Sequence, residues 1–137
     1  MKTILVGYDD TEPSQRALGR AIDLAKAFDA GLLVTSVAPT MEGSGRSAGP
    51  LDPTDMPDKH RAELEQAQKQ ASDAGVTAQQ VLAVGHPAEV IVSLAKDHDA
   101  DMIVVGTREP GFYQRLLGQS VSNAVAHHAR CDVLIVH

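Results

Sequence analysis

The sequence contains very few aromatic residues and no tryptophan. Aromatic residues make up 3% of its 137 positions, so a folded core must be built from Val, Ile, Leu and Ala. Apolar residues account for 43% of the chain, which is enough for a sizeable core and excludes a disordered composition. The length favours one compact domain that spans residues 1–137.

The cysteine count, the lack of long apolar runs and the shortage of basic residues each argue against a class of protein. The single cysteine, Cys131, can form no internal disulfide, which favours a cytoplasmic location. No apolar run approaches the ~20 residues of a transmembrane helix, and the N-terminal run is too short for a signal peptide. The formal charge of −6 argues against general nucleic-acid binding, which needs a basic surface. We therefore expect neither a membrane nor a nucleic acid as a partner.

Apolar periodicity predicts strands that alternate with helices. Strands are expected at residues 3–8, 32–37, 78–84, 101–106 and 131–136. Helices are expected at residues 13–28 and 58–75, from residue 87, and from about residue 118 or 120 to 129. Thr11 is a candidate cap for the first helix, and Pro13 fits its first turn. Residues 39–57 contain four prolines and three glycines, which predicts a mobile loop.

The alternation of strands and helices predicts an α/β fold. We expect an open, doubly wound, five-stranded parallel sheet with helices on both faces. In such sheets ligands bind beyond the carboxyl ends of the strands, where the strand order reverses. If the first and fourth strands are neighbours, the loops "YDDTEPS" and "GTREPGF" meet at that point. The first N–H groups of the last helix would face the same crevice and could hold an anion.

Three stretches of the sequence resemble the universal stress protein family. They are "ILVGYDDTEPSQRAL", "VGHPAEVIVSLAKDHDADMIVVGTR" and "SVSNAVAHHARCDVLIV", and the resemblance covers nearly the whole chain. It implies the strand order 3-2-1-4-5 and an adenine-nucleotide alpha-hydrolase-like fold. It also implies a homodimer formed through the last strand, residues 132–136, and in many members a bound ATP.

The same resemblance assigns a set of residues to an adenine-nucleotide site. The expected contacts are Asp9, Val37, Gly106, Thr107, Arg108, Ser120, Val121 and Ser122. Asp9 matches an acid near the ribose and adenine, and Val37 matches a residue whose backbone meets the adenine. A Mg²⁺ ion held by Asp9 or Asp10 could accompany the phosphates, because this ion is commonly bound by one or two carboxylates plus phosphates.

The glycine loop departs from the pattern of nucleotide-binding members. That pattern is Gly, two residues, Gly, nine residues, Gly, then Ser or Thr. Gly106 matches its first glycine, but Glu109 and Gln119 stand at the second and third. Each adds a Cβ where glycine permits positive φ or close approach, and Glu109 adds a charge that repels phosphate by about 4 kcal/mol at ~4 Å. Asp10 also replaces what is often Gly in the first loop.

Two functions therefore stay open. The chain is either a regulatory stress-response dimer that binds an adenine nucleotide through a modified glycine loop, or a dimeric interaction module of the same family that binds none. Efficient catalysis is not predicted, because the P-loop pattern G-x-x-x-x-G-K-[ST] is absent and no Ser-His-Asp or Cys-His spacing indicates a nucleophile. The histidines form no metal-binding motif, and a slow ATPase stays open.

Overall fold

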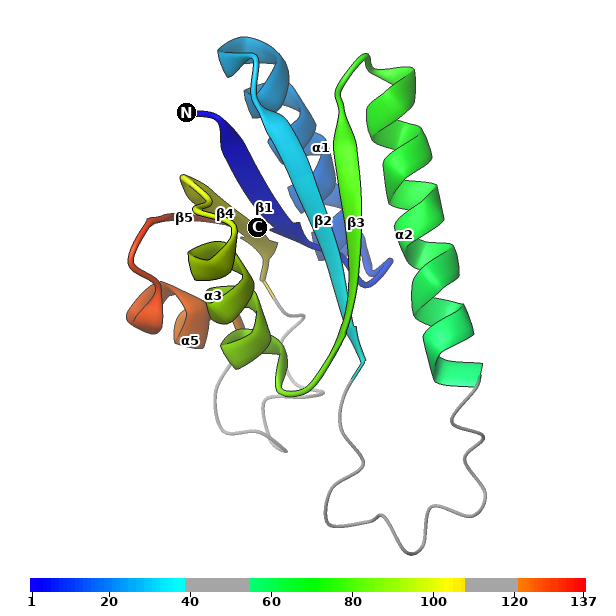
Figure 1. Cartoon of the computed structure of the whole chain (residues 1–137), viewed down its shortest axis with the longest axis vertical. Coiled ribbons are helices and arrows are strands. Elements are labelled where there is room, and N and C mark those ends of the chain that lie inside the picture. The colour runs from blue at the N-terminus through cyan, green and yellow to red at the C-terminus, as the bar shows by residue number, and fades with distance from the viewer. Residues whose placement is uncertain (39–54, 108–120) are drawn as a thin grey trace, which may run out of the picture.

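The sheet has the strand order expected from the resemblance. The computed structural model describes residues 1–38, 55–107 and 121–137, without the side chains of residues 55–57. Its strands are β1 (Thr3–Gly7), β2 (Gly31–Ala38), β3 (Ala78–Val84), β4 (Met102–Gly106) and β5 (Asp132–Val136). They form one sheet in the order β3-β2-β1-β4-β5, and every neighbouring pair is parallel (Figure 1). This confirms the predicted α/β class and topology.

Helices cover both faces of the sheet, as predicted for a doubly wound fold. The described helices are α1 (Glu12–Phe28), α2 (Asp55–Asp73), α3 (Pro87–Asp97) and α5 (Val121–His128). Side chains of β1 alternate between the faces: Ile4 and Val6 pack with α1 and α2, and Leu5 packs with α3 and α5. None of these described helices is long and apolar enough to cross a membrane.

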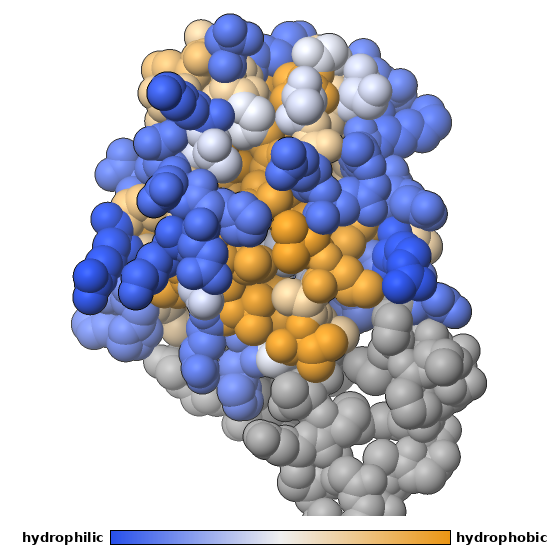
Figure 2. Space-filling view, viewed as in Figure 1, coloured by the Kyte–Doolittle hydropathy of each residue, from blue (hydrophilic) through white to orange (hydrophobic). Residues whose placement is uncertain are grey.

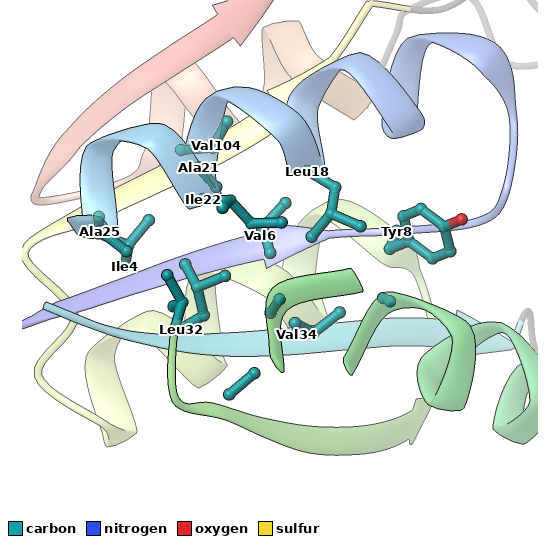
Figure 3. Packing of buried hydrophobic residues seen from close by; sticks show 14 of the residues in the cluster. Ile4, Val6, Tyr8, Leu18, Ala21, Ile22, Ala25, Leu32, Val34 and Val104 are labelled. Carbon is teal, nitrogen blue, oxygen red and sulfur yellow. The ribbon is translucent and has the colours of Figure 1, made fainter. Parts of the chain in front are cut away.

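The core is aliphatic, as the shortage of aromatic residues requires. Leu18 and Ala21 of α1 point at Ile4 and Val6 of β1, and all four are fully buried (Figure 3). Tyr8 lies at the end of this row, at the carboxyl end of β1, and is 3% exposed. The apolar row therefore ends in one buried hydroxyl group.

The starts of α1 and α2 can be compared with the predicted starts of the first two helices. Thr11 caps α1, because its side chain accepts a hydrogen bond from the Ser14 N–H, and Pro13 lies in the first turn as expected. The predicted loop 39–57 is wrong at its end, because α2 already begins at Asp55. Pro57 is compatible with a first turn, where a missing N–H costs no helical hydrogen bond. The remainder of that predicted loop lies outside the described residues.

Gly106 brings the end of β4 against the start of α1. A Cβ atom at Gly106 would lie 2.5 Å from the backbone carbon and the oxygen of Pro13, which no side chain tolerates. By contrast, a Cβ at Gly19 in α1 would meet nothing within 4 Å. Gly106 is therefore required by the packing of β4 on α1, whatever else it contacts.

We predict opposite effects of alanine at these two glycines. Gly106→Ala should lower the free energy of unfolding by about 2 kcal/mol, because the new methyl group overpacks the contact with Pro13. Gly19→Ala should raise it by about 1 kcal/mol, because alanine is the better helix former. Urea unfolding of both variants and the wild type measures these differences. Equal stability of Gly106→Ala and the wild type would show that the two elements are not in close contact.

Candidate functional site

The candidate site is the region at the carboxyl end of the sheet where β1 and β4 end side by side, which is the position expected for the crevice of a doubly wound sheet. Each strand is hydrogen-bonded one residue beyond its end to its other neighbour. The Tyr8 N–H donates to the Thr35 carbonyl of β2, and the Thr107 N–H donates to the Val136 carbonyl of β5, each at 2.9 Å. Thr107 is thereby fixed at the same edge of the sheet as the loop that follows Gly7. The structure thus brings the ends of the two predicted loops to one edge of the sheet.

Asp9 is an exposed acid whose carboxylate is oriented by the start of α1. Its Oδ1 accepts from the Thr11 N–H at 3.1 Å and from the Thr11 hydroxyl at 2.5 Å. Its own N–H donates to Ser14 Oγ at 3.2 Å. These bonds form a closed turn before the helix, so the carboxylate has a defined position beside the crevice.

Asp10 occupies a backbone conformation that favours glycine. Its φ is +63°, in the left-handed region, which Asp tolerates better than most residues. Its Oδ1 accepts from the Tyr8 hydroxyl and from Gln15 Nε2, both at 3.0 Å. Two donors therefore orient the Asp10 carboxylate, and neither of them is a partner of the Asp9 carboxylate. Among the residues that the structure describes, no group of three His, Cys, Asp or Glu side chains could hold a metal ion.

Tyr8 is the buried donor that holds Asp10, and the sequence analysis did not single it out. Burial is the main cause that raises the pKa of its hydroxyl far above its usual range. The hydrogen bond to Asp10 and the negative charges of Asp10, Glu63 and Asp9 add to the rise. Tyr8 consequently stays protonated at neutral pH and remains a donor.

The other predicted contacts divide into three groups. Val37 and Val121 both pack on the apolar cluster of the α3 face. Ser122 is 3% exposed, so its prediction as a ligand contact is the one that burial supports least. Arg108 and Ser120 lie outside the described residues, as do the two glycine replacements of the loop.

An apolar surface adjoins Val37. Figure 2 shows apolar side chains gathered over the lower part of the sheet between α3 and α2, with hydrophilic side chains around them. Val37 and Val81 both pack on the apolar cluster of the α3 face and are half-buried. Such a surface suits the face of a flat apolar ring.

Sequence reasoning missed a cluster formed by Ser36, His60 and Glu63. Ser36 Oγ lies 2.5 Å from His60 Nδ1 and donates to Glu63 Oε1 at 3.0 Å, and His60 Nδ1 is also 3.0 Å from Glu63 Oε1. In a catalytic triad the acid and the nucleophile contact opposite nitrogens of the histidine, whereas here both contact one. Ser36 is also fully buried. The cluster therefore does not have the arrangement of a nucleophilic site.

Comparisons with known proteins agree with the fold and with the family resemblance. The family model described as the universal stress protein family matches residues 1–137. A putative universal stress protein of Staphylococcus saprophyticus is 33% identical over 138 aligned residues, which cover 98% of this chain and 83% of that protein.

Two solved structures are similar over almost their whole length. A universal stress protein in complex with cAMP is 30% identical, with a TM-score of 0.78, and the match covers 99% of this chain and 97% of that one. The universal stress protein UspA from Lactobacillus plantarum is 22% identical, with a TM-score of 0.82 and the same coverage, and supports the fold alone.

We predict that Tyr8 makes stability depend on pH in the alkaline range. Its raised pKa means that the unfolded chain releases this proton first, near the ordinary value of 10.0. The contribution is therefore complete below pH 10 and is lost as pH rises above it. From pH 8 to pH 11 the wild type should lose about 1.4 kcal/mol more than Tyr8→Phe.

Urea unfolding of both proteins at the two pH values measures this difference. Tyr113 is present in both proteins, so its own titration cancels. Parallel losses of stability in the two proteins would mean that Tyr8 ionises freely in the folded state.

Proposed function

Because this chain belongs to the universal stress protein family, we propose that it is a regulatory stress-response protein that binds an adenine nucleotide where β1 and β4 end. The observation that carries this proposal is the engagement of Asp10 by Tyr8 and Gln15. These two hydrogen bonds orient the Asp10 carboxylate and partly offset its charge, at a position where the family often has glycine. The relative in complex with cAMP supports the choice of an adenine nucleotide.

The residues present fit the base and ribose better than a long phosphate chain. Val37 and the apolar surface beside it suit the adenine ring, and the oriented carboxylate of Asp9 suits a ribose hydroxyl donor. In the alignment with the family pattern, Glu109 stands at a glycine of the phosphate loop, and Asp10 adds a second negative charge in the first loop. Each further phosphate charge increases the repulsion, so a nucleotide with a single phosphate, such as AMP or cAMP, is favoured over ATP.

The role of the site is binding rather than turnover. The geometry of Ser36, His60 and Glu63 does not supply a nucleophile, and the carboxylates of Asp9 and Asp10 have separate hydrogen-bond partners. A Mg²⁺ ion that accompanied ATP would therefore be held by one of these acids together with the phosphates. We propose a cytoplasmic protein that responds to nucleotide levels.

We predict that single-phosphate nucleotides bind more tightly than ATP. Calorimetric titration should give saturable binding of AMP and cAMP, and ATP without Mg²⁺ should bind at least ~10-fold more weakly because of its added charge. Asp9→Ala should weaken AMP binding by about tenfold through loss of a charged hydrogen-bond acceptor. Asp23→Ala, which removes an exposed acid from the middle of α1, is the matched control and should leave the affinity unchanged.

Titration with AMP, cAMP, ADP and ATP, each with and without Mg²⁺, covers the alternatives. If the wild type gives no binding signal with any of these nucleotides at millimolar concentration, the proposal is contradicted. That result would favour the dimeric interaction module that binds no nucleotide.

The proposal includes a homodimer formed through β5. This strand pairs with β4 at one edge of the sheet, and Val133, Leu134 and Ile135 are half-buried there. An apolar edge strand without proline or a central charge favours pairing with another chain. Two copies of β5 related by a two-fold axis would cover both edges at once.

We predict that the protein sediments as a dimer, at twice the 14.5 kDa of one chain. The Val136 carbonyl accepts from Thr107, so the backbone groups of Ile135, one residue earlier, point outward from the sheet. Ile135→Pro removes an outward N–H and leaves the pairing with β4 intact, so it should shift the equilibrium toward monomer. Analytical ultracentrifugation measures both proteins, and circular dichroism checks that the variant is folded. A wild type that sediments as a monomer would refute the dimer.

A further inference from the structure

A buried polar cluster attaches α2 to β2 beside the nucleotide crevice. It consists of Ser36 on β2 and of His60 and Glu63 on α2, with the three contacts of 2.5–3.0 Å described above. Ser36 is fully buried and Glu63 is 6% exposed. Figure 1 shows that α2 begins at the edge of the sheet where the parallel strands end. The cluster thus lies near the end of the sheet that carries the proposed site.

The buried carboxylate makes this attachment specific. Removing Glu63 from water costs free energy that its hydrogen-bond partners must offset. Its described partners are the Ser36 hydroxyl and the His60 ring, which belong to different elements. The three groups are satisfied together only when α2 has one position relative to β2. Loss of one member leaves the other two incompletely paired.

Tyr8 links this cluster electrostatically to the loop that follows β1. Its hydroxyl donates to Asp10, and besides burial, the charges of Asp10, Glu63 and Asp9 all raise its pKa. Acids from the loop and from α2 therefore act on the same buried hydroxyl. The start of α2, the end of β1 and the end of β2 share one electrostatic environment.

Ser36 also adjoins the residue expected to meet the adenine. Ser36 and Val37 are consecutive in β2, so their side chains point to opposite faces of the sheet. Ser36 contacts α2, and Val37 packs on the α3 face. The two residues share a peptide unit, so a displacement of Ser36 moves the backbone of Val37.

We propose that Ser36, His60 and Glu63 are positioning residues for the adenine site. They hold the end of β2 in the conformation that receives the base. This inference rests on the proposed function, because it specifies how that same site is kept in shape. Since coupling between two sites is reciprocal, bound nucleotide in turn stabilises the attachment of α2.

A second polar link between α2 and the sheet provides a matched control. Gln68 Nε2 donates to the Ala78 carbonyl at 2.9 Å, at the start of β3. Parallel strands start at the edge opposite the crevice, so this link is remote from Val37. Gln68 Oε1 also accepts from Gln80 Nε2 of β3. Gln68→Ala and Ser36→Ala therefore each remove two hydrogen bonds between α2 and the sheet, and only Ser36→Ala does so beside the site.

Titration of cAMP and AMP into the wild type and both variants tests the positioning role. Ser36→Ala should weaken binding about five- to tenfold, and Gln68→Ala by less than about twofold, although both should lower the midpoint of thermal unfolding. Unchanged affinity in folded Ser36→Ala, or equal losses in the two variants, would overturn the positioning role alone. A wild type that binds neither ligand would overturn the proposed function and this inference with it.

Hydrogen exchange in the wild type keeps the test decisive if Ser36→Ala does not fold, and Glu63→Gln serves as the conservative variant. Glutamine has the size of glutamate and keeps an acceptor oxygen for Ser36, so this variant should bind cAMP within about threefold of the wild type. Hydrogen exchange supplies a readout that a merely structural cluster would not change. Saturating cAMP should slow amide exchange around residues 60–63 in the wild type and in Glu63→Gln. Exchange rates in α2 that do not respond to cAMP in the wild type would refute the coupling.

Discussion

The crevice depends on one steric constraint, the contact between Gly106 and the first turn of α1. The backbone of Pro13 lies where a Cβ of residue 106 would be, so β4 and α1 meet at a distance that only glycine permits. This contact sets how closely the loops after β1 and β4 approach each other. A glycine that the family resemblance connects with phosphate is therefore needed first for packing. Its presence alone is weak evidence for a ligand, and the case for one depends on the charges around it.

Those charges are organised by the buried hydroxyl of Tyr8. An acid with left-handed backbone at position 10 would leave a bare charge in the loop, but Tyr8 and Gln15 hold it. Burial and the surrounding acids keep Tyr8 protonated, so the donor is present at any neutral pH. The consequence is an acidic but ordered loop, in which, under the proposed function, each additional phosphate charge of a ligand adds repulsion.

The sequence predicts the elements better than their mutual contacts. The Thr11 cap and the alternation of strands and helices follow from local sequence and periodicity, because neighbours along the chain encode them. The strand order was expected from the family resemblance, and the structure confirms it. The start of α2 was missed because Pro57 and the prolines before it read as a loop, although a first turn accommodates proline. The Ser36–His60–Glu63 cluster was missed because His60 and Glu63 lie 24 and 27 residues after Ser36 and contact it only through tertiary packing.

The position of that cluster bears on how nucleotide binding at the proposed site could affect the rest of the domain. A ligand shifts an equilibrium only by its different affinity for two states, so the site must be connected to an element that can change. β2 is such a connection, because Ser36 contacts α2 on one face and Val37 borders the crevice on the other. One strand in a rigid sheet can pass a displacement between its faces without rearrangement of the core. The outer face of α2 carries exposed charged side chains such as Glu65 and Lys69. Under the proposed coupling, this is the surface whose position depends on whether nucleotide is bound.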